Sequence, residues 1–408
     1  MKRDACAWKT GGSLRRKEAD SIGKTAAKST GPETERAVLV AVEVKGQDNL
    51  WNLQDSLGEL AYLAKTAGAV VVGTISQRSD RFTQTYVGKG KLQEIRDMLE
   101  QQRAHVAIFD DELTPSQQRN LEDALEVKVI DRTALILDVF SRHAKTFEGK
   151  LQVELAQHQY LLPRLAGQWS HLERLGGGIG TRGPGETQLE TDRRLVRNRI
   201  QKIQGQLDGV RRRRDLYMGR RKKAGIPSAT LVGYTNAGKS TLFNALSDAA
   251  VQAADQLFLT LDPVTRRVHL PSGGELLLTD TVGFIQKLSP KVVAAFRATL
   301  EEVSSSDILL QVVDVTHPKA AEQTQVVEET LAELGLAQRP RVLVLNKVDL
   351  LGDDDGQTAE LPSKQRKAQP SVLVSAAKGW NLDVLLRRIE DLLAVGEGPL
   401  LVVGAAAN

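Results

Sequence analysis

The stretch that decides the fold of this chain reads Gly233-Tyr234-Thr235-Asn236-Ala237-Gly238-Lys239-Ser240. An apolar run, Ala229 to Tyr234, leads into it and predicts a buried strand, whereas Ser240 to Leu246 predicts a helix. A strand, a loop of the pattern G-x-x-x-x-G-K-[ST] and a helix are the context of a phosphate-binding P-loop. The glycines let backbone N–H groups converge on phosphate oxygens at the positive end of the helix dipole. We therefore expect Lys239 to neutralise the outer phosphates of a nucleotide and the Ser240 hydroxyl to ligate Mg²⁺. The nucleotide contacts expected from this stretch are Gly233, Tyr234, Thr235, Asn236, Ala237, Gly238, Lys239, Ser240 and Thr241.

A second strand, Glu275 to Thr279, ends at Asp280-Thr281-Val282-Gly283. Behind a P-loop, an aspartate in this place holds Mg²⁺, usually through water, and the Gly283 amide can sense the γ-phosphate. The segment Asp255 to Arg267 lies between the two motifs and predicts the first switch. Its Thr260 is our choice for the second hydroxyl ligand of Mg²⁺, with Thr265 as the competing candidate. The residues expected to act in hydrolysis are Lys239, Thr260 and Gly283, and those expected to hold the metal are Ser240, Thr260 and Asp280.

Base identity is read from two segments that follow further strand-like runs, Asn346-Lys347-Val348-Asp349 and Ser375-Ala376-Ala377-Lys378. The Asp349 carboxylate can accept two hydrogen bonds from the N1–H and N2–H₂ edge of guanine, and adenine offers no matching pair of donors. A buried acceptor left unpaired costs roughly 1–3 kcal/mol, so the wrong base is rejected. We expect Lys347 to lie over the ring, the serine turn to close on guanine O6, and GTP or GDP to be preferred over ATP.

Two residues bear on the rate of hydrolysis. Phe284 follows Gly283, where many switch GTPases carry a glutamine that orients the attacking water. We therefore expect slow intrinsic turnover until a partner or a rearranged switch positions the water. Asn236 occupies the P-loop position that binds a monovalent cation in potassium-activated GTPases, which gives the hypothesis of a K⁺ site beside the phosphates.

Composition favours a multidomain protein outside the membrane. The chain has 408 residues, more than one hydrophobic core normally organises, of which 41% are hydrophobic and 26% charged. No apolar stretch reaches the roughly 20 residues that cross a bilayer. Cys6 is the only cysteine, as a reducing compartment would lead one to expect. We expect a cytoplasmic protein without a membrane span, a disulfide or a thiolate metal cage.

The apolar pattern divides the chain into three folded parts. Strands and helices alternate in the first third, which predicts a small parallel sheet covered by helices. A helical region follows, and two of its helices are expected to pack as an antiparallel hairpin. The a/d spacing of a coiled-coil seam is carried by Val196, Ile200, Ile203, Leu207 and Val210. The expected division is a disordered basic tail 1–34, an N-terminal α/β domain 35–145, a helical hairpin 146–225, a P-loop G domain with a mostly parallel sheet 226–395, and a short tail 396–408.

The hairpin carries two features that suit a polyanionic partner. Its loop, Gly176 to Gly185, is rich in glycine and contains Arg182. Its second arm, Arg193 to Lys223, holds thirteen Lys or Arg against two acids. A flexible linker and a solvated helix face are the ordinary interpretations of such segments. A glycine tip beside a basic arm nonetheless favours nucleic acid, because glycine backbone can approach phosphates and base edges while arginine supplies charge and stacking.

The chain resembles the HflX family of translational GTPases from about Arg36 to Leu393. The most specific resemblance lies outside the general GTPase motifs, in Lys150-Leu151-Gln152-Val153-Glu154-Leu155-Ala156-Gln157, Leu162-Pro163-Arg164-Leu165, Arg182-Gly183-Pro184-Gly185-Glu186 and Glu190-Thr191-Asp192-Arg193-Arg194. Thr260-Leu261-Asp262-Pro263 and Asp280 to Phe284 also match the family's switches. After the Leu382 to Leu393 helix only a short tail remains, so we expect any extra C-terminal domain to be minimal or missing.

The resemblance implies a cytosolic GTPase that binds the large ribosomal subunit and its rRNA through the Gly176 to Gly185 loop and the Arg193 to Lys223 arm. It further implies that the protein splits stalled or idle ribosomes under stress, with hydrolysis stimulated by the ribosome, and that it is monomeric when free. Two other functions stay open on the residues alone. One is a GTPase that assists ribosome assembly or RNA modification, and the other is a GTP-regulated binding module with negligible turnover.

Overall fold

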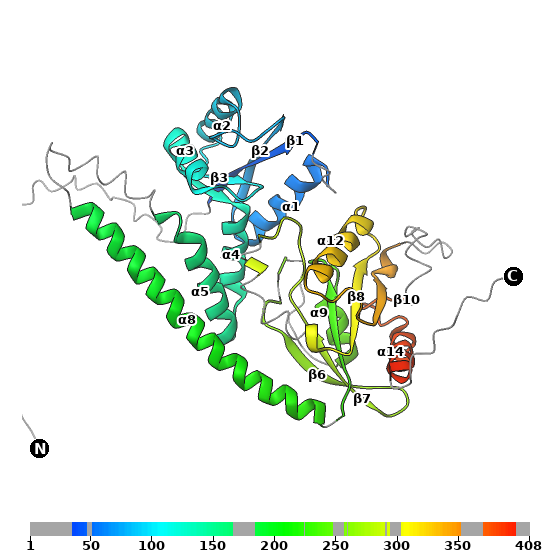
Figure 1. The fold of residues 1–408 in the computed structure, drawn as a ribbon. Helices are drawn as coiled ribbons and strands as arrows, with labels where there is room; N and C mark the ends of the chain where they lie inside the picture. Colours follow the sequence, from blue (N-terminus) through cyan, green and yellow to red (C-terminus); the bar gives the residue numbers. More distant parts are fainter. Residues whose placement is uncertain are drawn as a thin grey trace, which may run out of the picture. The chain divides into compact units, whose positions relative to one another are not determined.

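Two β-sheets, their covering helices and a pair of long helices make up the described part of the chain (Figure 1). The computed structural model describes residues 35–46, 51–165, 184–223, 225–247, 257–258, 260–289, 292–293, 303–351 and 370–396. The predicted tail 1–34 lies outside the described residues, and so do residues 397–408 of the predicted tail 396–408 and most of the predicted glycine loop, 176–183.

The N-terminal sheet has four parallel strands in the order β2-β1-β3-β4. Its elements are β1 (Arg36–Val44), α1 (Leu53–Thr66), β2 (Val70–Ser79), α2 (Lys89–Gln101), β3 (Val106–Phe109), α3 (Pro115–Leu125), β4 (Lys128–Asp131) and α4 (Arg132–His143). The central strand β1 is apolar on both faces, as a covered parallel strand must be. Successive β1 side chains lie in different apolar clusters. Leu39 clusters with residues of α1 and α4, and Val40 clusters with residues of α2 and α3.

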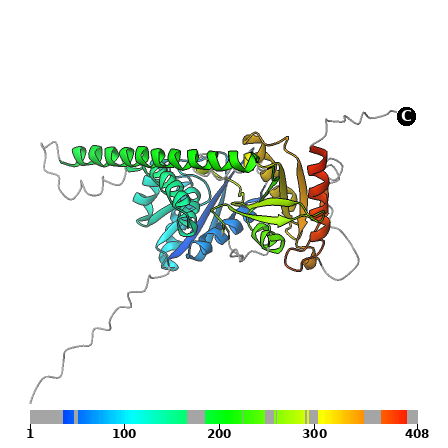
Figure 2. The ribbon, with the colours of Figure 1, turned by 90° about the horizontal axis from the view of Figure 1, so that it is seen from below.

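Helices α5 (Phe147–Leu161) and α8 (Pro184–Lys223) form the predicted antiparallel hairpin. Glu148, in the first turn of α5, pairs with Arg214, whereas Glu154 further along α5 pairs with the earlier Arg199 of α8 at 2.6 Å. The later residue of α5 pairs with the earlier residue of α8, so the two helices run antiparallel. Figure 2 shows α8 as one long helix that extends past α5.

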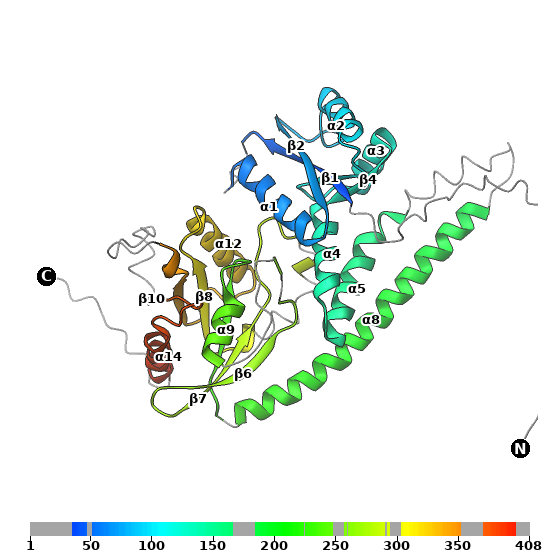
Figure 3. The same ribbon diagram turned by 180° about the vertical axis from the view of Figure 1, so that it is seen from behind.

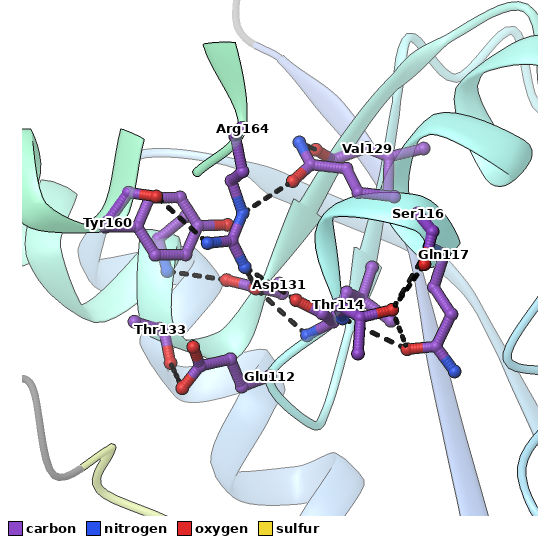
Figure 4. A network of polar contacts seen from close by, with 12 residues as sticks. Glu112, Thr114, Ser116, Gln117, Val129, Asp131, Thr133, Tyr160 and Arg164 are labelled. Atoms are coloured by element: carbon purple, nitrogen blue, oxygen red, sulfur yellow. Dashed lines mark hydrogen bonds and ion pairs between the residues drawn. The ribbon is translucent and has the colours of Figure 1, made fainter. Parts of the chain in front are cut away.

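Arg164 fastens the end of α5 to the N-terminal sheet. Its guanidinium donates to the Leu113 carbonyl at 2.6 Å, pairs with Asp131 at 3.2 Å and lies 3.6 Å from the Tyr160 ring centroid. Figure 4 shows this side chain reaching past the Tyr160 ring toward Asp131. Arg164 is only 6% exposed, so the segment that directly follows α5 is held by a buried, charge-assisted anchor.

The second sheet, called here the G sheet, has six strands in the order β10-β9-β8-β5-β7-β6. All pairs are parallel except β6 with β7, which are antiparallel. Its elements are β5 (Ser228–Gly233), α9 (Lys239–Ser247), β6 (Val264–His269), β7 (Glu275–Asp280), β8 (Ile308–Asp314), α12 (Ala320–Glu333), β9 (Arg341–Asn346), the 3₁₀ turn η1 (Val348–Leu350), β10 (Ser371–Leu373) and α14 (Leu382–Gly396). Helices α9 and α14 share one apolar cluster with the sheet and α12 another, so they cover opposite faces (Figures 1 and 3).

This architecture confirms the predicted α/β fold class and places the motifs. The P-loop, the Asp280 motif and the Asn346 motif all follow the carboxyl ends of parallel strands, which is the edge where open α/β sheets bind ligands. Two details differ from expectation. Helix α4 was not predicted, and α8 begins at Pro184, so the last two residues of the predicted Gly176 to Gly185 loop are helical. Within the described residues, no helix is both long and apolar enough to cross a membrane.

Candidate nucleotide-binding site

The P-loop makes two backbone approaches that only glycine permits. Gly233 has φ of 152°, and a Cβ there would overlap the carbonyl oxygen of Val312 on the neighbouring strand β8. Gly238 has φ of 92°, and its Cβ would overlap the side-chain amide of Asn346. Both positions combine a conformation that L-residues rarely adopt with a close neighbour. The spacing of the motif is therefore set by the close approach of Gly233 to strand β8 and of Gly238 to Asn346 at the end of β9.

Lys239 begins α9 and points back under the loop. Its ammonium donates to the carbonyls of Gly233 at 3.1 Å and Tyr234 at 2.8 Å, and the residue is buried. Burial lowers the pKa of Lys239 to about 8, against the opposing pull of Asp280. A buried ammonium bonded to neutral carbonyls gains strongly from a nearby anion, and a phosphate is the anion that this loop geometry suits.

Three oxygen-bearing side chains converge at the start of α9. Ser240 Oγ lies 2.7 Å from Thr260 Oγ1 and 2.7 Å from Asp280 Oδ2, and Thr260 Oγ1 lies 3.1 Å from the same carboxylate oxygen. Burial raises the pKa of the Asp280 carboxyl, while the hydrogen bond from Ser240, the Lys239 charge and the hydrogen bond from Thr260 oppose this rise. Among the described groups, none donates to the buried Asp280 Oδ1. Two hydroxyl oxygens and a carboxylate, one oxygen of which has no hydrogen-bond partner within the described part of the chain, are a set of ligands that fits Mg²⁺.

The two threonine candidates of the first switch lie in different places. Thr260 belongs to the cluster just described, whereas Thr265 lies within strand β6 and bonds Thr279 Oγ1 of β7 at 2.9 Å. Of the two, the structure therefore brings only Thr260 to Ser240. Three residues of the predicted switch, 255, 256 and 259, lie outside the described residues.

Gly283 and Phe284 close the other side of the P-loop. A Cβ on Gly283 would stand 2.7 Å from Thr235 Cα and 2.9 Å from Lys239 Nζ, so glycine is required by contact. Phe284 forms a parallel bridge with Tyr234, accepts from Thr235 N at 2.8 Å and is 4% exposed. The side chain at the usual glutamine position is thus part of the apolar core and cannot orient water.

At the predicted guanine-binding end of the site, Asn346 forms hydrogen bonds with two loops. Its Nδ2 donates to the Ala237 carbonyl at 3.0 Å and its Oδ1 accepts from Ala376 N at 3.0 Å. Asp349 Oδ1 accepts from Ser375 Oγ at 2.6 Å, which holds the carboxylate against the predicted serine turn. The Lys347 ammonium pairs with Asp314 at 2.6 Å.

The remaining predicted contacts lie in the same loops. Asn236 is exposed with φ of 63°, and Thr281 donates to the Leu231 carbonyl at 2.6 Å. Tyr234, Thr235 and Ala237 are buried in the P-loop, Val282 is buried beside Gly283, and Ala377 lies in the serine turn. Thr241 is part of the first turn of α9. The structure thus brings the predicted residues into one continuous edge of the G sheet.

Sequence reasoning missed a group of charged residues that reaches this site from the N-terminal sheet. The Tyr234 hydroxyl donates to Glu59 of α1 at 2.5 Å and accepts from Gln286 N at 3.0 Å. Lys287, three residues after Phe284, pairs with Asp110 at 2.6 Å and Asp111 at 2.8 Å. Two adjacent aspartates directly after the apolar strand β3 are the signal that could have marked this contact.

The comparisons with known proteins begin with three family models. Residues 54–141 match the N-terminal region of a GTP-binding GTPase, and residues 143–221 match its middle region. Residues 228–347 match a model described as a 50S ribosome-binding GTPase. Together the matched ranges run from α1 through β9.

Curated relatives extend these matches. "GTPase HflX" of Caldanaerobacter subterraneus subsp. tengcongensis is 50% identical over 359 residues, which covers 88% of this chain and 80% of the relative. "GTPase HflX" of Escherichia coli K12 is 44% identical over 362 residues, which covers 88% of this chain and 83% of the relative. A GDP complex of a GTP-binding protein from Sulfolobus solfataricus is 26% identical, with a TM-score of 0.45 over 89% of this chain and 100% of that chain. At this level of identity over most of its length, the chain belongs to the HflX family of P-loop GTPases, which bind GTP and hydrolyse it.

Proposed function

We propose that this GTPase binds the large ribosomal subunit and couples its GTP cycle to the splitting or rescue of ribosomes under stress. The G domain's match to a model described as a 50S ribosome-binding GTPase supports the partner. We further propose that the protein acts in the cytoplasm and is monomeric when free. The hairpin of residues 146–225 serves as the ribosome-binding arm in this proposal, and its predicted glycine loop provides the tip.

The observation that carries the proposal is the charge on α8. This helix runs over 40 residues from Pro184 to Lys223, and its contact with α5 leaves much of its surface exposed. The exposed cationic side chains of its described part are Arg194, Arg197, Lys202, Arg211, Arg212 and Arg213. A rod of exposed arginines attracts a phosphate backbone by releasing condensed counterions, as binding to rRNA requires.

At the nucleotide site, we propose that Ser240, Thr260 and Asp280 hold Mg²⁺ and that Lys239 contacts the outer phosphates. Mg²⁺ would neutralise charge on the phosphates there. The Asp349 carboxylate selects guanine, held in place by Ser375. These assignments rest on the convergence of oxygen atoms at the start of α9 and on the carboxylate held at the serine turn.

The same site suggests slow turnover without a partner. Because Phe284 is buried against the P-loop, another group has to orient the attacking water. We propose that large-subunit binding supplies or arranges that group. The exposed Asn236 remains the proposed position of a K⁺ ion, and turnover compared in KCl and NaCl tests it.

Two measurements on the full-length protein test the proposed function. Sedimentation with purified large subunits should be retained with a non-hydrolysable GTP analogue and lost with GDP. Turnover of GTP should rise on addition of those subunits, and Lys239→Ala should remove both effects because its nucleotide is lost. Preferential sedimentation with precursor particles would favour the assembly function instead. Equal turnover with and without any ribosomal particle would contradict the proposal.

A further inference from the structure

Asp262 connects the first switch to the start of helix α5. Its Oδ2 accepts hydrogen bonds from the backbone N–H groups of Lys145 and Thr146, each at 2.8 Å. Its Oδ1 accepts from the Thr146 hydroxyl at 2.5 Å, and that hydroxyl in turn caps α5 by accepting from Gly149 N at 2.9 Å. A carboxylate that receives three donors at a helix N-terminus makes charge-assisted bonds and a favourable contact with the helix dipole.

The first turn of α5 is shaped to admit this carboxylate. A Cβ on Gly149 would overlap Asp262 Oδ1 and would stand 3.2 Å from the Thr146 hydroxyl. Glycine is a poor helix residue, and its presence three positions into a helix has a steric reason here. Gly149 therefore belongs to the same contact as Asp262, although 113 residues separate them in the sequence.

A second contact holds the same segment from its other end. The Phe258 ring packs edge-on against Phe140 of α4, with ring centroids 4.6 Å apart and an interplanar angle of 74°. Phe258 is 3% exposed. The segment is thus fixed to α4 on one side of Thr260 and to α5 on the other, and between these points the Thr260 hydroxyl reaches Ser240 and Asp280.

Helix α5 also contacts the arginine-rich helix α8. Glu148 lies in the same turn as Gly149 and pairs with Arg214 of α8. The Arg214 and Glu148 side chains are only 15% and 20% exposed, so solvent screens this ion pair less than a surface pair. Ser240 therefore contacts Thr260, the backbone joins Thr260 to Asp262, and Asp262 contacts the start of α5. The first turn of α5 in turn contacts α8.

We propose that Asp262 is a positioning residue, which places the Thr260 hydroxyl at the nucleotide site according to the position of α5. The proposal rests on the assignment of Thr260 as a Mg²⁺ ligand in the GTP state. If α5 holds Asp262 in place, Thr260, two residues away, is restrained near Ser240. Because Thr260 is assigned as a Mg²⁺ ligand in the GTP state, this restraint favours binding of GTP over binding of GDP. Linkage makes the effect reciprocal, so a partner that holds α8 and α5 favours GTP over GDP by the same factor.

The test is Gly149→Ala in the full-length protein, because this residue lies far from every GTPase motif in the sequence. The added methyl displaces the Asp262 carboxylate, so the ratio of affinities for a non-hydrolysable GTP analogue with Mg²⁺ and for GDP should fall. Couplings of this kind are about 5- to 150-fold, and we expect a fall of at least about fivefold. The matched control is Gly205→Ala, since Gly205 lies within α8 with nothing within 4 Å of a built Cβ. It should leave the ratio unchanged.

Asp262 variants separate positioning from general damage to the fold. Asp262→Ala should lower the affinity ratio as Gly149→Ala does, and Asp262→Asn, which keeps the shape and one acceptor, should restore part of it. The double variant Gly149→Ala/Asp262→Ala should lose no more than the larger single loss, because both changes remove one contact. A merely structural role would lower both affinities together and leave their ratio intact, which would overturn the proposal.

Thr260→Ala serves as the reference. If it lowers the ratio and the Gly149 and Asp262 variants do not, the coupling is wrong while the metal assignment stands. If Thr260→Ala itself leaves the ratio unchanged, the assignment of Thr260 fails and the coupling fails with it.

Discussion

Asn346 shows how one side chain organises the predicted base-binding end of the site. Its amide uses both of its ends, one toward the P-loop at Ala237 and one toward the serine turn at Ala376. It is 2% exposed, so both bonds are shielded from water. Asn346 therefore fixes the distance between the P-loop and the serine turn. Asp349, three residues later, lies where it accepts a hydrogen bond from Ser375.

Replacing Asp349 with Asn tests the assignment of guanine recognition. The substitution keeps an acceptor for Ser375 but turns one carboxylate oxygen into an NH₂ donor, which would face a donor of guanine. An unpaired or opposed polar group costs about 1–3 kcal/mol. GTP affinity measured by fluorescent-nucleotide displacement should therefore fall roughly 5- to 150-fold. Xanthosine triphosphate offers an acceptor at the changed position, so it should bind the variant better than the parent. Unchanged GTP affinity would remove Asp349 from the base contact.

At the scale of elements, motifs that depend on local geometry were predictable and contacts between distant elements were not. The P-loop could be placed because the Gly233 and Gly238 spacing encodes its own backbone conformation. Helix α4 was missed because Leu135, Ile136 and Leu137 are all buried, which removes the one-sided stripe by which a surface helix is recognised. The Asp262 contact with α5 could not be predicted either, because no local sequence pattern indicates which distant helix a carboxylate will contact.

The charge of α8 gives a prediction at this scale. Arg212 and Arg213 are exposed, whereas Arg214 in the same basic run is turned inward to Glu148. Reversing the two exposed residues together, Arg212→Glu with Arg213→Glu, should weaken large-subunit binding. The dependence of log affinity on log salt should also flatten by about 1.4–1.8, because two phosphate contacts are lost. Sedimentation across a salt series measures both quantities.

The control for this experiment is the nucleotide affinity of the same double variant, which should equal that of the parent because neither residue touches the site. Arg214→Ala should, in contrast, change the nucleotide affinity. It removes the ion-pair partner of the largely buried Glu148, which lies beside the Asp262 contact. If the double variant binds subunits with the parent's affinity and salt slope, α8 is not the rRNA-binding surface.

At the scale of the whole molecule, the N-terminal sheet and the G sheet meet through a chain of charged groups, of which the Arg132, Glu59 and Asp110 side chains are buried and Lys287 is partly exposed. The Arg132 guanidinium bonds Glu59 and, at 2.8 Å, Asp110, and Asp110 also pairs with Lys287 at 2.6 Å. Both Arg132 and Asp110 are at most 1% exposed. Burial alone would lower the pKa of Arg132, but Glu59 and Asp110 outweigh it and raise that pKa. Each charge in this chain is tolerated only because its neighbours oppose it.

Asp110→Ala should therefore be costly, because it removes one acceptor from Arg132 and one from Lys287 and leaves the Ser56 hydroxyl without its 2.6 Å partner. Breaking a buried pair by removing one member costs about 3–5 kcal/mol of unfolding free energy. Asp138→Ala is the matched control, since it also removes an aspartate paired with an arginine, Arg142 at 2.9 Å, but both side chains are about half exposed. Its cost should be about 0–1 kcal/mol. Urea unfolding followed by Trp51 fluorescence, with the other tryptophans replaced by phenylalanine in all three proteins, reports on this contact because the Trp51 ring stacks on Tyr234. Equal losses for the two variants would mean that Glu59 and Asp111 alone satisfy Arg132 and Lys287, and that Asp110 does not hold the two sheets together.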